Sequence, residues 1–329
     1  MSRFTDRIAL AGWGLGTLAR HGWPRVLTHF AAGVGDELML TAVIRALRER
    51  GAPRFWVMSR RPELYQHNPD VAAVVPVDPR VPALARRCGA RIVEPRYGIP
   101  LGTEGNLRPP PAHMITCLMA TAGITGPVNL RPVIHLTEAE RAAAAKWSGC
   151  IVIQPSVRSA VRPNELKEWW PDRWQAAVDA LGSGHRVVQV GGEHDPLLRG
   201  VEDQRGHGLS LRQAAAMLSQ ARLFVGLESG FMHLARAVDC PAVILFGGRV
   251  HPDQGGYAGH VALARAPACS PCWLYTGCVL DRQCMRDITP EDVVAAIRTA
   301  LAQPRGPLPD MTVNLTPAEQ QRIAAALAG

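Results

Sequence analysis

The sequence predicts an α/β protein with two parallel sheets, and three observations lead to this prediction. Short apolar runs alternate with segments of helical periodicity along most of the 329 residues. The alternation stops at residues 124–135, which hold turn-forming residues and two prolines, and then starts again. Several of the apolar runs end in glycine-containing turns. Two successive series of this kind predict two Rossmann-like domains with a cleft between them.

The first series occupies residues 1–135. We expect a strand at Val26–Phe30, a glycine-bearing turn at 31–35, and a helix at Leu38–Arg50 whose apolar residues share one face. The further elements expected here are strands at Phe55–Met58 and Val71–Val77 and a helix at Ala112–Thr121. Residues 1–25 contain a short apolar segment broken by glycines, and we expect an extension of unassigned role.

The second series occupies residues 136–329. Thr137 and Glu140 form a capping box for an alanine-rich helix, so we place the domain boundary just before it. The elements expected after it are strands at Ile151–Ile153, Val187–Val190, Arg222–Leu227 and Ala242–Phe246, and helices at Asp172–Leu181, Leu211–Gln220 and Phe231–Val238. Two last helices are expected within residues 291–327, at Glu291–Leu301 and Pro317–Leu327. The proline-rich stretch Pro304–Pro309 between them can return the chain across the cleft.

Composition narrows the class of protein. No apolar run reaches the roughly 18 residues that span a bilayer, and the start of the chain lacks the features of a secretory signal. We therefore expect a cytoplasmic protein. Residues 1–135 hold 17 Arg, no Lys and 9 acidic residues, whereas residues 136–329 hold 19 basic and 19 acidic residues. The whole excess charge lies in the first half, which indicates either an anionic partner, a membrane surface included, or an arginine-rich solvated surface.

Residues 223–237 resemble an anion site in outline. An apolar run ends in Glu228, Ser229 and Gly230, a helix follows, and His233 lies three residues after the glycine. Unpaired N–H groups and the helix dipole favour phosphate oxygens at such a helix start. The simpler interpretation is a strand-to-helix connection in which Ser229 caps the helix and His233 packs.

Asp36 is the candidate catalytic residue. Together with Gly35 it lies on the first strand-to-helix turn, where open α/β sheets bind their ligands. A partly shielded carboxylate in the cleft can take a proton from an attacking hydroxyl. The alternative is an aspartate that serves only to cap the helix.

Three further polar residues follow strands or precede a helix in the second half. Ser156 follows the first strand, and Lys167, one of only two lysines in the chain, precedes the next helix, where an ammonium group suits a phosphate. Glu193 follows Gly191–Gly192 and can accept the hydroxyls of a ribose. A solvated lysine and an ordinary glycine-rich turn are the competing interpretations.

Four of the eight cysteines lie within 16 residues, at Cys269, Cys272, Cys278 and Cys284. Disulfides are disfavoured in the cytosol, so four thiolates on one loop, 269–284, indicate a tetrahedral structural site for zinc or iron. Reduced or redox-active thiols are the alternative.

Taken in order, these motifs resemble glycosyltransferase family 9, the heptosyltransferases that use ADP-heptose to build lipopolysaccharide core or, in one branch, to modify autotransporter proteins. The resemblance covers about residues 26–301. It is carried by Gly35-Asp36, Pro155-Ser156, Lys167 with Trp170-Pro171, Gly191-Gly192-Glu193, and Glu228-Ser229-Gly230-Phe231-Met232-His233-Leu234-Ala235.

The resemblance implies a GT-B fold, with the acceptor on the first domain and the nucleotide-sugar on the second. It implies that Asp36 deprotonates the acceptor, that Lys167, Ser229, Gly230 and His233 stabilise the departing diphosphate, and that Glu193 holds the ribose. The anomeric centre is inverted, and no catalytic divalent metal is expected. The four-cysteine loop is similar to the metal-binding finger of the autotransporter branch.

The chain departs from the family at several positions. Glu228 and Phe231 stand where the family has Asp and Pro, one extra Trp separates Lys167 from Pro171, and Ala42 replaces a common proline. The sugar therefore stays open, as does the choice between a saccharide and a protein acceptor.

We weigh three functions. The first is an inverting transferase that moves heptose or a related sugar to a lipopolysaccharide-type saccharide or a protein hydroxyl, with a contact to the inner membrane surface left open. The second is a sugar-nucleotide epimerase or hydrolase of the same fold. The third is a zinc-ribbon nucleic-acid-binding protein, which is disfavoured because the cysteines lie in the neutral half of the chain.

Overall fold

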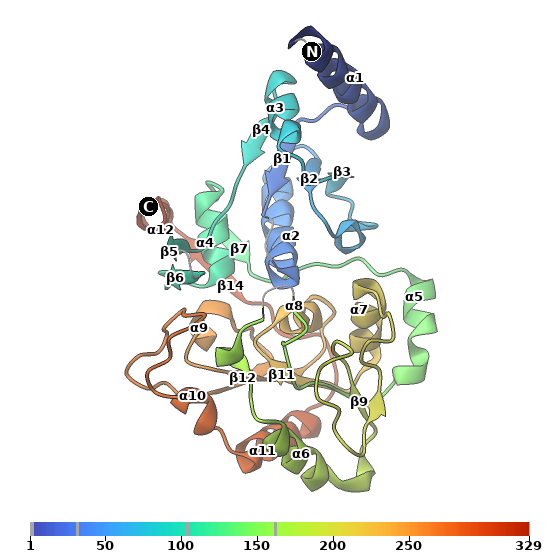
Figure 1. Cartoon of the computed structure of the whole chain (residues 1–329), viewed down its shortest axis with the longest axis vertical. Helices are drawn as coiled ribbons and strands as arrows, with labels where there is room; N and C mark the ends of the chain where they lie inside the picture. The colour runs from blue at the N-terminus through green and yellow to red at the C-terminus, as the bar shows by residue number, and fades with distance from the viewer. Residues whose placement is uncertain (1–2, 31–32, 103–104, 161–162, 329) are drawn as a thin grey trace.

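The computed structural model describes residues 3–30, 33–102, 105–160 and 163–328, so the first part of the predicted turn at 31–35 lies outside the described residues. Two parallel sheets form two separate layers, which confirms the predicted α/β class (Figure 1). In Figure 1 the first sheet lies in the upper part of the molecule, the second lies below, and the lower end of α2 meets α8.

The first sheet has four parallel strands in the order β3-β2-β1-β4. Its strands are β1 (Val26–His29), β2 (Phe55–Met58), β3 (Val71–Val75) and β4 (Arg91–Val93). Strand β1 lies between β2 and β4, and the next helix in the chain is α2 (Val34–Glu49). The apolar stripe of α2 is almost fully buried, which explains why its pattern was readable in the sequence.

The second sheet has six parallel strands in the order β10-β9-β8-β11-β12-β13. Its strands are β8 (Ile151–Gln154), β9 (Val187–Gln189), β10 (Glu202–Asp203), β11 (Leu223–Leu227), β12 (Ala242–Phe246) and β13 (His260–Ala264). Every residue of β8, β11 and β12 is buried, as expected for strands with helices on both faces. The chain begins this sheet at β8, builds outward to β10, and then returns to place β11 on the other side of β8.

The remaining helices lie around the two sheets, and some of them pack on other helices instead of a sheet. They are α3 (Arg80–Arg87), α4 (Met114–Thr121), α5 (Glu138–Ala143), α6 (Pro171–Leu181), α7 (Leu211–Gln220), α8 (Gly230–Ala237), α9 (Pro252–Gly255), α10 (Gln283–Arg286) and α11 (Pro290–Ala302). The capping box predicted at Thr137 and Glu140 is present at the start of α5. Short antiparallel strands β5 (Ile99–Leu101) and β6 (Asn106–Arg108) pair with each other.

The C-terminal segment leaves the second sheet and packs on the first half of the chain. After α11 the chain forms β14 (Thr312–Leu315), which pairs antiparallel with β7 (Gly126–Asn129). Helix α12 (Pro317–Ala326) then packs against α4. The proline-rich stretch therefore does return the chain to the first half, whereas β14 was not predicted from the sequence.

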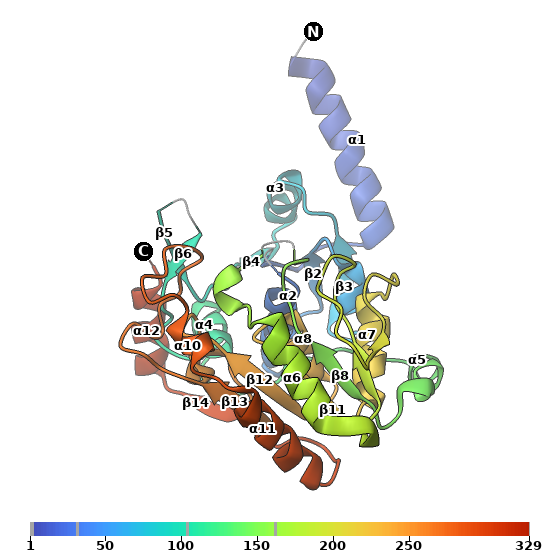
Figure 2. The same ribbon diagram turned by 60° about the horizontal axis from the view of Figure 1, so that its bottom comes forward.

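The expected extension contains a helix, α1 (Arg3–His21), which projects from the body of the molecule (Figure 2). Its glycines made a helix hard to predict, because each costs about 1 kcal/mol relative to alanine in a helix. Among the described residues, no helix is long and apolar enough to cross a membrane.

Candidate active site

The site lies where the two sheets present the carboxyl ends of their central strands to each other. In the second sheet, β8 and β11 flank the point at which the strand order reverses, the usual position of a ligand in open α/β sheets. In the first sheet, β1 and β4 flank the corresponding point. Helices α2 and α8 follow β1 and β11 and pack against each other.

Asp36 lies in the first turn of α2, where its carboxylate has two donors. The backbone N–H of Gly33 donates to Oδ2 at 2.6 Å, and the hydroxyl of Tyr97 donates to Oδ1 at 2.7 Å. Burial raises the pKa of Asp36, and the two hydrogen bonds and the charge of Lys167 act against that rise. Asp36 thus contributes to the start of α2 and is also a carboxylate with an elevated pKa, a property suited to proton transfer.

The helices α2 and α8 meet at two glycines that the sequence singled out. A Cβ at Gly35 would lie 2.5 Å from Cδ2 of His233, and a Cβ at Gly230 would lie 3.0 Å from Cβ of Val34. Neither position has room for a side chain. Glycine therefore lets Asp36 and the start of α8 approach each other closely.

Lys167 and Glu228 form a largely buried ion pair beside the start of α8. The ammonium contacts the Glu228 carboxylate and donates to its backbone carbonyl oxygen at 3.1 Å. Burial lowers the pKa of Lys167, with the charge of Glu228 opposing the change. Burial also acts to raise the pKa of Glu228, but Lys167 and Arg249 outweigh it, so the net shift is downward and the carboxylate stays charged.

Ser229 is the N-cap of α8 and joins the two central strands. Its Oγ accepts from the N–H of Phe231 at 3.3 Å and donates to Oε1 of Gln154, at the end of β8, at 2.7 Å. Ser229 therefore caps α8 and also lies at the carboxyl end of the central strands, the edge at which open α/β sheets bind ligands. Gln154 was not singled out from the sequence.

His233 is buried one turn into α8, with Nδ1 2.6 Å from the hydroxyl of Tyr257. Burial lowers the pKa of His233 to about 4, so the ring is uncharged at neutral pH. It can supply a hydrogen bond, but not the positive charge that would neutralise a diphosphate. Of the groups predicted from the sequence, Lys167 and the start of α8 are then those that can offer positive charge to a diphosphate.

Two further residues of this site were not predicted from the sequence. Tyr97, which binds Asp36, comes from the loop between β4 and β5, and Arg249 comes from the loop after β12. The Arg249 guanidinium lies 4.4 Å from the Tyr275 ring centroid, and its charge lowers the pKa of Glu228. Neither residue belongs to a local motif, so no sequence signal marks them.

Two predicted site residues, Ser156 and Glu193, make no contact with Asp36 or Lys167 in the described part of the chain. Ser156 is buried and donates to Glu168 Oε1 at 3.3 Å. Glu193 is exposed, whereas Asp195 accepts from the Gly192 N–H at 2.8 Å and from Ser159 Oγ at 2.8 Å. Their roles toward a donor stay predictions.

The four-cysteine loop reaches the site through an aromatic contact. Trp273 lies 5.9 Å from the ring of Tyr97 and donates to Gln254 Oε1 at 2.8 Å. All four thiols are free; burial raises the pKa of Cys272, and the other three thiols raise it further. Within the described ranges, no group of three or more His, Cys, Asp or Glu side chains is arranged to hold a metal ion. The expected metal site is therefore not formed by the thiols as they are placed.

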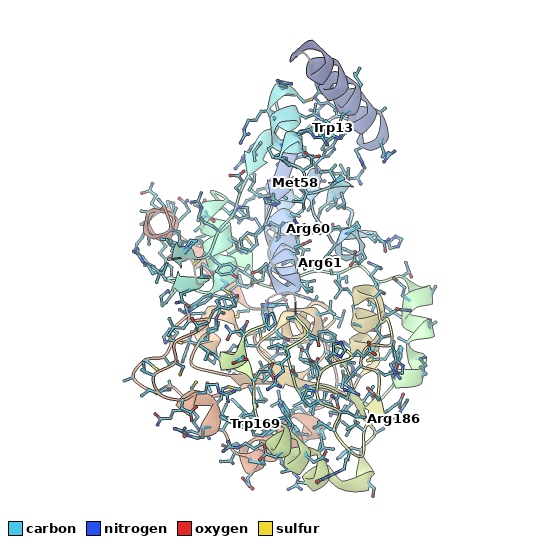
Figure 3. The ribbon with its side chains drawn as sticks, viewed as in Figure 1. Trp13, Met58, Arg60, Arg61, Trp169 and Arg186 are labelled. Atoms are coloured by element: carbon cyan, nitrogen blue, oxygen red, sulfur yellow. The ribbon has the colours of Figure 1, made fainter. Side chains whose placement is uncertain are left out.

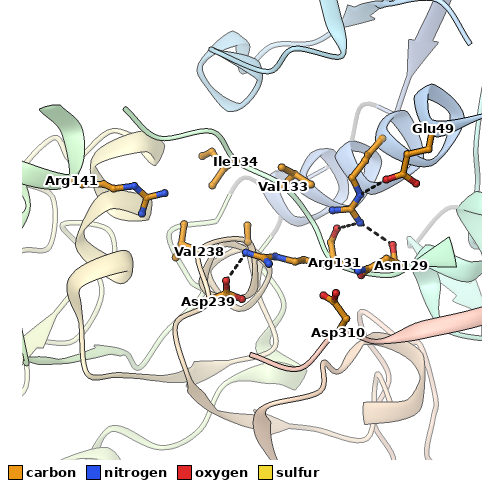
Figure 4. A pocket seen from close by; sticks show the side chains of 11 residues that line it. Glu49, Asn129, Arg131, Val133, Ile134, Arg141, Val238, Asp239 and Asp310 are labelled. Carbon is orange, nitrogen blue, oxygen red and sulfur yellow. Dashed lines mark hydrogen bonds and ion pairs between the residues drawn. The ribbon is translucent and has the colours of Figure 1, made fainter. Parts of the chain in front are cut away.

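A cavity of about 460 Å³ lies elsewhere, beside the connection between the two halves (Figure 4). Arg45 donates to the carbonyl oxygens of Asn129 and Arg131, and Arg131 pairs with Asp239 at 2.6 Å. The residues that line this cavity come from the last turns of α2, the connecting segment and the end of α8, away from Asp36. These hydrogen bonds and the ion pair tie the connecting segment to both halves.

Residues 127–274 match the model of glycosyltransferase family 9 (heptosyltransferase). Over these residues, 148 of the 329, the chain is similar to glycosyltransferase family 9. Lipopolysaccharide heptosyltransferase 3 of Escherichia coli K12 is 32% identical over 113 residues, which are 31% of this chain and 31% of that protein. The aligned region thus spans about a third of the length of this curated relative.

Solved structures of family 9 type extend the likeness in fold to most of the chain. The E. coli ADP-heptose lipopolysaccharide heptosyltransferase II has a TM-score of 0.61 at 17% identity, with 84% of this chain and 98% of that chain covered. TibC of enterotoxigenic E. coli, an iron-containing dodecameric glycosyltransferase, has a TM-score of 0.63 at 19% identity, with 84% and 76% covered. The α/β architecture with parallel sheets is therefore that of heptosyltransferase structures.

Proposed function

We propose that this protein is an inverting glycosyltransferase that transfers a heptose or a related sugar from a nucleotide-diphosphate donor, ADP-heptose in the first instance. The acceptor is a hydroxyl of an anionic saccharide or a protein. One observation supports this proposal above the others: the partly buried carboxylate of Asp36 and the helix start at Ser229 and Gly230 belong to two helices, α2 and α8, that pack against each other.

The chemistry proposed for the site is a direct displacement. Asp36 accepts the proton of the acceptor hydroxyl, and the oxygen attacks the anomeric carbon of the donor sugar. The bond from that carbon to the diphosphate oxygen breaks, and the electron pair leaves with the diphosphate. Lys167 and the positive end of the α8 helix dipole stabilise the leaving group.

Two relatives support the nucleotide proposal. TibC has been solved in complex with ADP-D-β-D-heptose, and the E. coli heptosyltransferase WaaC with ADP. The test is a thermal-shift screen of ADP-, GDP-, UDP- and CDP-sugars, because a ligand that binds only the native state raises its apparent stability. We expect the largest shift with ADP-heptose; equal shifts with all four would contradict the proposed donor.

Donor consumption separates transfer from the alternative chemistry. A transferase releases ADP at full rate only when the acceptor is present, whereas an epimerase or hydrolase consumes the donor alone. Rapid loss of ADP-heptose without any acceptor would replace the transferase proposal.

We also propose that Cys269, Cys272, Cys278 and Cys284 hold a structural zinc or iron ion after modest rearrangement of the loop. The clustering of the four thiols supports this, as does the iron named for TibC. Elemental analysis should find one ion per chain, and its removal should increase proteolysis within residues 269–284. A metal-free, equally protected loop would contradict the proposal.

A further inference from the structure

Arg249 is a buried arginine at the carboxyl edge of the second sheet. It lies in the loop after β12, the strand beside β11, and is 6% exposed. Within the described residues, no acidic side chain forms an ion pair with it. Burial of a charge without a counter-charge is unfavourable, so this guanidinium lacks an anion.

The four-cysteine loop holds Arg249 in place. The backbone N–H of Trp273 donates to the Arg249 carbonyl oxygen at 3.0 Å, and Nε of Arg249 donates to the carbonyl oxygen of Leu274 at 3.1 Å. The guanidinium lies 4.4 Å from the ring centroid of Tyr275 and 5.1 Å from that of Trp273. Contact with aromatic faces orients a guanidinium and leaves its N–H edge for hydrogen bonds. The Nη groups of Arg249 are therefore held in position for an acceptor.

The loop that carries Arg249 begins beside the Lys167–Glu228 ion pair. A Cβ at Gly247 would lie 3.3 Å from the carbonyl oxygen of Leu166, the residue before Lys167. Burial is the largest influence on the pKa values of Lys167 and Glu228, and the charge of Arg249 lowers both. Since Coulomb energies fall with distance, the guanidinium and the ion pair belong to one electrostatic site.

The charges of this site are not balanced within the second half. Lys167 is the cation of the proposed mechanism, but its ammonium already contacts the carboxylate and the carbonyl oxygen of Glu228. Arg249 brings a second positive charge and no second carboxylate. The start of α8 beside them also favours negative charge. Two cations and one carboxylate leave one positive charge for a ligand.

We propose that Arg249 binds the diphosphate of the donor through its Nη groups, as a second cation beside Lys167. The inference rests on the proposed function, which places a nucleotide-diphosphate at this edge. A planar guanidinium binds phosphate oxygens through two parallel hydrogen bonds, which an ammonium cannot do. It stabilises the negative charge that grows on the diphosphate as the bond to the anomeric carbon breaks.

The donor is favoured over an anionic acceptor as the partner of Arg249. Arg249 lies on the half to which the proposed function assigns the donor. The half assigned to the acceptor has an exposed arginine of its own, Arg60, which follows β2. Figure 3 shows Arg60 in the upper part of the molecule, where the first sheet lies.

Isothermal titration calorimetry of the full chain with ADP, pyrophosphate and adenosine tests the role of Arg249. Arg249→Gln should weaken the binding of ADP and pyrophosphate about 10- to 100-fold, because hydrogen bonds between charged groups are lost. Binding of adenosine, which carries no phosphate, should stay the same. Arg249→Lys keeps the charge without the planar fork and should weaken ADP by a smaller factor. If Arg249→Gln does not fold, Arg249→Lys decides by the same comparison.

The matched control is Arg265→Gln. Arg265 follows β13, the strand next to β12, and pairs with Asp292 at 2.7 Å, so it is an arginine at the same edge that already has its partner. This variant should bind all three ligands as the unmodified protein does. Equal weakening by Arg265→Gln, or equal weakening of adenosine by Arg249→Gln, would overturn the proposal.

Pyrophosphate separates this inference from the proposed donor. If the unmodified protein binds pyrophosphate but not ADP, and Arg249→Gln weakens pyrophosphate, the adenine nucleotide is wrong and the role of Arg249 stands. If ADP and pyrophosphate bind equally well to Arg249→Gln, the inference fails and the donor stands. A raised KM for the acceptor in that variant would then assign the guanidinium to the acceptor. Absence of binding of both ligands to the unmodified protein would contradict both proposals.

Discussion

At the scale of single residues, Asp36 depends on its neighbours for its properties. Burial between the two halves of the chain raises its pKa, while the Tyr97 hydroxyl and the Gly33 N–H stabilise the charged form. A general base must be deprotonated to act, so activity should fall as the pH drops through this raised pKa. The acid limb of the rate profile should therefore lie above the pH expected for an ordinary aspartate.

Tyr97→Phe tests this arrangement. The variant removes one hydrogen bond from the carboxylate and keeps the aromatic ring beside Phe30 and Trp273. Loss of a hydrogen bond to a charged group, about 1.5 kcal/mol, should raise the pKa of Asp36 by about one unit. The acid limb of kcat against pH should move up by that amount, with little change at high pH.

The control for this variant is Tyr65→Phe, because Tyr65 is a buried tyrosine that faces Glu37 and not Asp36. Its pH profile should match that of the unmodified protein. An unchanged profile for Tyr97→Phe would mean that Asp36 does not set the acid limb.

Only some residues of the candidate site could be predicted from the sequence. Asp36, Lys167, Glu228 and Ser229 were found because each lies at a strand end or a helix start, where the position itself suggests a role. Tyr97 and Arg249 come from loops without periodicity and reach the site only through tertiary packing. The loss of positive charge on His233 likewise depends on burial, which a sequence does not state.

At the scale of elements, the contact of α2 with α8 is the structural requirement of the proposed mechanism. It brings the carboxylate on one helix to the start of the other, where we propose that the diphosphate binds, and it depends on glycine at positions 35 and 230. The long helices and buried strands were predicted within a few residues because their periodicity matches their burial. Short strands such as β4 and β10 carry no such pattern, because only their hydrogen bonds to neighbouring strands make them strands.

Gly35→Ala tests the helix contact. Its new Cβ would lie 2.5 Å from Cδ2 of His233, a side chain already fixed by Tyr257. Overpacking of this kind costs about 1–3 kcal/mol in the free energy of unfolding. We expect that loss in urea titrations, together with at least a tenfold lower kcat as Asp36 moves away from α8.

The control for Gly35→Ala is Gly16→Ala, the same substitution at a helix position with free space around it. Nothing lies within 4 Å of its new Cβ, so the intrinsic preference of helices for alanine should stabilise the protein by up to about 1 kcal/mol. If Gly35→Ala behaved like Gly16→Ala, the close approach of α2 and α8 would not exist.

At the scale of the whole molecule, the last elements of the second half pack on the first half and so link the two halves. Strand β14 and helix α12 come last in the sequence but pack on β7 and α4 of the first half. Arg212 on α7 adds a second link, since it pairs with Glu140 at 2.5 Å and donates to the carbonyl oxygen of Glu63 at 3.1 Å. The relative placement of the two sheets is therefore held by several elements at once.

Ile323→Ala tests the role of α12. Ile323 is 2% exposed, and truncation of such a side chain typically costs about 2–5 kcal/mol. We expect that decrease in unfolding free energy, measured in urea, while the affinity of the native protein for ADP stays the same because α12 packs on α4 and not on α8. Ile323→Val should cost only about 0.5–1.5 kcal/mol. Unchanged stability in both variants would show that α12 does not pack as described.

The central claim is that Asp36 acts on an acceptor beside a donor held at the start of α8. It is tested most directly by measuring turnover and donor affinity on the same preparation of Asp36→Asn, with ADP-heptose as donor. Asparagine keeps the size of the side chain but cannot take the proton, so kcat should fall about 10²–10⁴-fold while the Kd of ADP-heptose changes little. Full turnover by Asp36→Asn would contradict the account.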